Sequence, residues 1–71
     1  MAKLLSSKEI IKVLLDNEFY FISQKGSHRK YRKLDRVVIV PYPKKEIPIG
    51  TLKSIIRQSG LNKNLFMKSR I

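Results

Sequence analysis

The chain is short and contains no cysteine, and these two features together limit the folds open to it. Its 71 residues can form no disulfide bond, so a small hydrophobic core has to hold the chain together. A domain of this size buries only about 60% of the surface that its unfolded chain exposes. We therefore expect one domain over residues 1–71, with one core and room for one functional site. The lack of cysteine also favours the reducing cytoplasm as its location.

A large excess of positive charge indicates the kind of partner. The chain has 16 lysines and arginines against 5 aspartates and glutamates, which gives a net charge of +11 and a pI of about 10.4. Such a chain attracts polyanions, so nucleic acid is the first partner to consider and an acidic protein is the second. A membrane is not expected, because no segment reaches the roughly 20 apolar residues of a spanning helix.

Capping signals and apolar spacing predict two helices. Ser6 and Glu9 have the spacing of a capping box, and the helix that follows should run to about Asp16. A second helix should begin near Thr51 and end at a left-handed glycine cap, Gly60. The side chains expected on the buried helix faces are Ile10, Ile11, Leu14, Leu15, Leu52, Ile55 and Ile56.

The segment between these helices has the pattern of three strands. An aromatic stretch starts at Phe19, Lys25–Ser27 supplies a turn, and a second strand should run from about His28 to Leu34. A short turn then leads to Val37–Val40, a β-branched run typical of a buried strand. Pro41 should end the pairing, because proline cannot donate a ladder hydrogen bond.

Side chains alternate along a strand, which divides the central strand into two faces. His28, Lys30 and Arg32 share one face, while Arg29 and Tyr31 share the other. Because Tyr31 carries the large ring, its face should meet the core. His28 is then turned outward, between two cations.

Two further groups of residues have expected positions. The connection from Pro41 to Gly50 contains three prolines and two lysines and should be stiff and exposed. Tyr20 and Tyr42 fit either the core or a base-stacking platform. The remaining aromatic residues, which are expected in the core, are Phe19, Phe21, Tyr31 and Phe66.

The predicted order is helix, three antiparallel strands, helix, which is an α+β fold. Both helices need cover for their apolar faces and one small sheet provides it, so both should pack on the same side of that sheet. This is the α-β-β-β-α architecture of double-stranded-RNA-binding domains. Residues 61–71 either form a short last helix starting at Asn62 or fray, and the sequence leaves both open.

Several short motifs carry a more specific resemblance. Gly26–His28 is followed by Tyr31, by a β-branched strand ending in Pro41, and by the helix start Gly50–Leu52. In this combination the chain resembles the HicA family of toxins, from its first helix through Leu61. The resemblance implies a small cytoplasmic ribonuclease of a type II toxin-antitoxin system, an mRNA interferase that a HicB antitoxin inhibits.

The resemblance also implies a catalytic residue, His28, which occupies the position of the family's catalytic histidine in its Gly-Ser-His motif. One position departs from the family. Many members carry a further histidine where this chain has Pro43, so no role is assigned to residues 41–43. With one imidazole, the second proton transfer has to pass to a lysine, a tyrosine or water.

The chemistry of RNA cleavage fits these residues without a metal. A deprotonated 2′-hydroxyl attacks the neighbouring phosphate, and His28 can act as the base or the acid. The remaining candidates for RNA binding are Lys25, Gly26, Ser27, Arg29, Lys30 and Arg32. One histidine, no cysteine and five scattered carboxylates do not favour a metal site, so no metal or cofactor is expected.

Two functions stay open at this point. The first is a metal-independent endoribonuclease that cleaves mRNA and is blocked at the His28 face by a HicB-like acidic antitoxin. The second is a non-catalytic RNA-binding module that grips the backbone and 2′-hydroxyls of an A-form helix. A substitution of His28 separates the two, because only the first function requires the imidazole.

Overall fold

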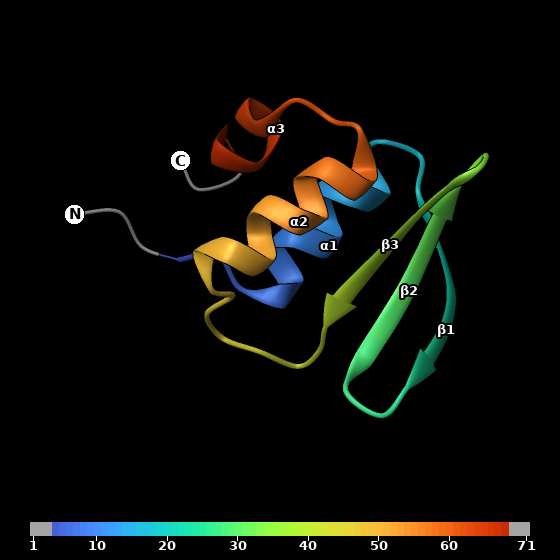
Figure 1. Cartoon of the computed structure of the whole chain (residues 1–71), viewed down its shortest axis with the longest axis horizontal. Coiled ribbons are helices and arrows are strands. Elements are labelled where there is room, and N and C mark those ends of the chain that lie inside the picture. The colour runs from blue at the N-terminus through green and yellow to red at the C-terminus, as the bar shows by residue number, and fades with distance from the viewer. Residues whose placement is uncertain (1–3, 69–71) are drawn as a thin grey trace.

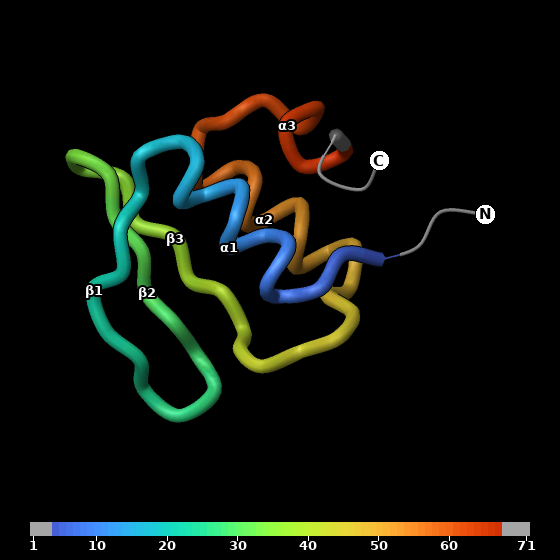
Figure 2. The backbone as a smooth tube through the Cα atoms, turned by 180° about the vertical axis from the view of Figure 1, so that it is seen from behind, coloured from blue at the N-terminus to red at the C-terminus, as the bar shows by residue number. Residues whose placement is uncertain are grey.

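The computed structural model describes residues 4–68, in which three strands are flanked by helices. The elements are α1 (Ser7–Asp16), β1 (Tyr20–Lys25), β2 (His28–Lys33), β3 (Arg36–Pro41), α2 (Ile49–Ser59) and α3 (Lys63–Lys68). The strands form one antiparallel sheet in the order β1-β2-β3. Figures 1 and 2 show α1 and α2 side by side on one side of this sheet, with α3 beside them. The α+β class, with both predicted helices on one face, is confirmed.

The predicted start of α1 is present in full. The Ser6 hydroxyl accepts a hydrogen bond from the Glu9 backbone N–H at 3.1 Å, and the Glu9 carboxylate accepts one from the Ser6 N–H at 2.8 Å. The buried face was only partly predicted, because Leu15 is 51% exposed while Val13 is buried. Residues three and four apart share a helix face, so Val13 follows Ile10 into the core, whereas Leu15 lies at the margin of that face.

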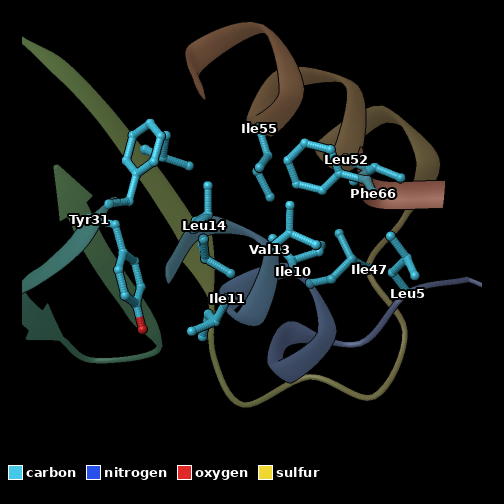
Figure 3. Packing of buried hydrophobic residues seen from close by; sticks show 13 residues of the cluster. Leu5, Ile10, Ile11, Val13, Leu14, Tyr31, Ile47, Leu52, Ile55 and Phe66 are labelled. Carbon is cyan, nitrogen blue, oxygen red and sulfur yellow. The ribbon is translucent and has the colours of Figure 1, made fainter. Parts of the chain in front are cut away.

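The core lies between the helices and the inner face of β2 and β3 (Figure 3). Its buried side chains are Leu5, Ile10, Ile11, Val13, Leu14, Phe19, Tyr31, Val38, Val40, Ile47, Leu52, Ile55 and Phe66. The β3–α2 connection was expected to be exposed throughout, and this is wrong at Ile47, which is fully buried. The Ile47 N–H donates to the Leu5 carbonyl at 2.7 Å, and Figure 3 places its side chain beside Leu5 and Ile10. At this residue the connection is therefore anchored to the segment that leads into α1.

Helix α2 packs on β3 and reaches its outer edge at one point. It begins at Ile49, before the expected Thr51, and ends at Ser59, followed by the predicted cap Gly60, whose φ of 70° is left-handed. The Gln58 side-chain oxygen accepts a hydrogen bond from the Ile39 N–H at 3.2 Å, on the strand edge that faces away from β2. A backbone N–H that would otherwise be open to another chain is satisfied in this way.

Among the aromatic residues expected in the core, Phe21 is the exception. It is 50% exposed, whereas Phe19, Tyr31 and Phe66 are buried. Phe21 faces the helix side of β1, where its ring meets Tyr31 edge-on with centroids 5.8 Å apart. The helices pack mainly on β3, so this face of β1 remains half open. The buried Phe66 belongs to α3, so residues 63–68 form the short last helix that was one of the two alternatives, while residues 69–71 lie outside the described residues.

Candidate active site

His28 is the first residue of the central strand and directly follows a tight turn. Gly26 has a φ of 58°, while Ser27 does not have a positive φ. This combination in a two-residue hairpin loop is the pattern of a type II′ turn, which needs glycine at its first position. The register sets His28 opposite Lys25 on β1 and opposite Pro41 on β3. The imidazole is therefore carried by an ordered ladder, at an exposed position of the sheet.

The end of the sheet that carries His28 is held by the start of α1 and by the β3–α2 connection. The Tyr42 N–H donates to the Ser27 carbonyl at 2.7 Å. Ser7 is buried, and its hydroxyl lies 2.6 Å from the Pro41 carbonyl oxygen and 3.1 Å from that of Lys44. Buried hydrogen bonds of this kind fix the local backbone, because breaking them leaves a polar group unsatisfied.

Arg29 points to the opposite side of the sheet from His28, as the alternation predicted. Its guanidinium carbon lies 3.6 Å from the centroid of the Tyr42 ring and 5.6 Å from that of Phe21. Its Nε donates to the Gln24 side-chain oxygen at 2.9 Å. Of the two positions left open for Tyr42, the structure supports the core: its ring is partly buried against the core cluster and stacks on Arg29, and its N–H donates to the Ser27 carbonyl.

The other candidate side chains are brought together on the outer face of the sheet. Lys25, His28, Lys30 and Arg32 are all exposed there. Gly26 and Ser27 form the adjoining turn. No aspartate or glutamate occurs between residues 19 and 34, so the sequence offers no local carboxylate to neutralise these cations. An anion that approaches His28 meets positive charge from its own strand and from β1.

The described residues contain neither a candidate metal site nor a candidate membrane-spanning helix. Within residues 4–68, no group of three or more histidine, aspartate or glutamate side chains is placed to hold a metal ion. None of the helices in that range has the length and apolar character needed to span a membrane.

Fold and site together define a class: a small, basic α+β protein with the architecture of double-stranded-RNA-binding domains, whose first hairpin presents a histidine among cations. Residues 7–61 match the family model described as the HicA toxin of bacterial toxin-antitoxin systems. The chain belongs to this HicA toxin family, which assigns it a toxin role and, in general terms, an antitoxin partner. No curated protein matches it.

Proposed function

We propose that this protein is the toxin of a type II toxin-antitoxin system and acts as a metal-independent endoribonuclease on mRNA. The observation that carries the proposal is the position of His28, exposed at the end of a rigid hairpin that contains cations and no carboxylate. The active unit is a single domain over residues 1–71, and it works in the cytoplasm, where its substrate is found.

The reaction begins with the 2′-hydroxyl of one ribose. His28, in its neutral form, accepts the proton of this hydroxyl while the 2′-oxygen forms a bond to the adjacent phosphorus. The bond from phosphorus to the 5′-oxygen then breaks, and that oxygen takes up a proton. The products are a 2′,3′-cyclic phosphate and a free 5′-hydroxyl. Proton transfer by a positioned imidazole typically contributes about 10² to 10⁴ in rate.

The second proton-transfer group is best supplied by Lys25 or by water. Lys25 and His28 are directly opposite in the ladder, and such pairs have Cβ atoms about 5 Å apart. The tyrosines are less suitable: Tyr31 is buried, Tyr42 stacks on Arg29, and Tyr20 lies at the other end of β1. The ammonium of Lys25 also stabilises the extra negative charge of the phosphorane.

A HicB-like acidic antitoxin would inhibit the enzyme by covering the His28 face. The net charge of +11 supports this proposal, because a partner of opposite charge associates rapidly and with strong dependence on ionic strength. An antitoxin bound there excludes RNA from the only histidine in the chain.

A substrate with one altered sugar tests this mechanism. We expect a transcript with a single 2′-deoxynucleotide at a mapped cleavage site to resist cleavage at that site, because the attacking hydroxyl is missing. Neighbouring sites in the same transcript serve as the control and should be cut as before. The cleavage products are measured by gel analysis of the end-labelled RNA. A cyclic phosphate at the new end is identified because a phosphatase removes it only after acid has opened the ring. Cleavage at the deoxy position at an unchanged rate would contradict the proposed nucleophile.

A further inference from the structure

The outer face of the sheet presents more than the catalytic histidine. The ladder sets Lys25 beside His28, Ser23 beside Lys30, and Tyr20 beside Arg32. All six side chains are exposed. Because α1, α2 and α3 lie on the other side, this face is uncovered in the part of the chain that the structure describes (Figure 1). Three rows, each with one cation from Lys25, Lys30 or Arg32, therefore follow one another from the hairpin turn to the far end of β1, with a β-bulge between the second and the third.

Tyr20 differs from the other aromatic residues on the sheet. Its ring is 52% exposed on the outer face, next to the guanidinium-bearing Arg32 and in the same row as the half-exposed Val37. The Arg32 Nε donates to the Leu34 carbonyl at 2.8 Å, which holds this side chain at the end of the strand. An exposed ring beside a cation is the combination that proteins use to bind the face of a nucleobase.

We propose that this outer face is a binding track for single-stranded RNA, in which Tyr20 stacks on a base and Lys30 and Arg32 contact the backbone. The proposal rests on the proposed function for its ligand, RNA, and adds the strandedness of that ligand and a residue that binds a base. A single strand can offer the face of an unstacked base to the ring, whereas the bases of a duplex are stacked on one another.

The geometry separates the stacked base from the cleaved bond. His28 and Arg32 are four residues apart on one strand, a distance of about 13 Å at 3.3 Å per residue. The base held at Tyr20 therefore belongs to a different nucleotide from the one whose bond is cut at His28. Tyr20 acts here as a binding residue that positions the RNA, and the chemistry stays with His28.

A pair of ring deletions on β1 tests the track. Tyr20 and Phe21 are adjacent and equally exposed, at 52% and 50%, but they face opposite sides of the sheet. In a His28→Ala background that leaves RNA uncut, we expect Tyr20→Ala to weaken binding of a labelled RNA of about 12 nucleotides by about tenfold. Phe21→Ala should change it by less than about twofold, and Tyr20→Phe should retain the binding. Fluorescence anisotropy gives the dissociation constants.

The same strand annealed to its complement decides between single-stranded and duplex RNA. We expect the duplex to bind more weakly and to be insensitive to Tyr20→Ala. Tighter binding of the duplex, or equal losses for Tyr20→Ala and Phe21→Ala, would overturn the proposal.

Two charge-matched double variants test the backbone contacts. The logarithm of the RNA-binding constant falls linearly with the logarithm of the salt concentration, and each phosphate contact of a single strand steepens this fall by about 0.7. Replacing Lys30 and Arg32 by glutamine should therefore make the slope shallower by about 1.4. Replacing the exposed Lys53 and Arg57 of α2 by glutamine removes the same charge and should leave the slope nearly unchanged. Equal effects of the two pairs would count against a localised track. RNA cleavage is measured separately, with the protein that keeps His28. If the track fails its binding tests, the ribonuclease proposal can still stand, and if cleavage fails, the binding tests still decide whether the track exists.

Discussion

Replacing His28 by alanine is expected to lower the rate of RNA cleavage by at least about 100-fold, because proton transfer by a positioned side chain supplies about 10² to 10⁴ in rate. RNA affinity should change little, since the imidazole contributes a small share of the charge that binds phosphate. The measurement is single-turnover cleavage of a labelled transcript with the protein in excess, together with the dissociation constant from anisotropy.

Two controls make this result specific. His28→Asn keeps a polar side chain that forms hydrogen bonds but cannot exchange a proton near neutral pH, and it should be as inactive as His28→Ala. His28 is an exposed strand residue, so both variants should keep the circular dichroism spectrum and unfolding midpoint of the unaltered protein. Cleavage by either variant within about threefold of the unaltered rate would assign the chemistry to another group.

The largest expected effect on stability comes from Ile47 in the β3–α2 connection. Ile47 is fully buried, so Ile47→Ala should lower the free energy of unfolding by about 2–4 kcal/mol through lost burial and the cavity left behind. This is a large part of the roughly 4–10 kcal/mol expected for a domain of this length. Ile49→Ala removes the same atoms from a side chain that is 52% exposed, and it should cost less than about 1 kcal/mol.

Urea unfolding followed by circular dichroism measures both free energies. If the two alanine variants have equal unfolding midpoints, Ile47 does not anchor the connection. Because this connection leads from Pro41, the cross-strand partner of His28, we also expect Ile47→Ala to lower cleavage at temperatures where the protein is still folded.

The parts of the fold that depend on local signals were predictable. The capping box at Ser6, the left-handed glycine at Gly60 and the tight turn at Gly26 each involve only a few neighbouring residues. The alternation along β2 then placed His28 and Arg29 on opposite faces, because one buried ring fixes the phase of a whole strand.

The features that sequence reasoning missed depend on how distant segments pack. Phe21 and Leu15 are apolar, belong to predicted elements and were expected to be buried, but both are half exposed. The helices cover β3 more than β1, and no local sequence pattern indicates which strand they will cover. Ile47 lies among prolines and lysines, where a single apolar residue is a weak signal, and it is buried because its segment pairs with buried Leu5, just before α1.

The faces on which the side chains around His28 lie were predicted more completely than the contacts that hold them in place. The cations flanking His28 were visible in the sequence, and the register confirms which of them share its face. The stack of Tyr42 on Arg29 was not visible, because it joins a strand to a loop from which no role was expected. The sequence offered one signal for this contact, the position of Tyr42 between two prolines. It did not indicate that Arg29 would be the partner of the ring, because that depends on the register of the strands.

The most direct test of the account is the cleavage of a labelled transcript by the purified, antitoxin-free protein in excess EDTA. If His28 and its surrounding cations suffice for the chemistry, the RNA is cut at the same rate with and without the chelator, and the new ends carry 2′,3′-cyclic phosphates. An intact transcript in EDTA that is cut once Mg²⁺ is restored would contradict the account, because the reaction would then depend on an ion rather than on the histidine.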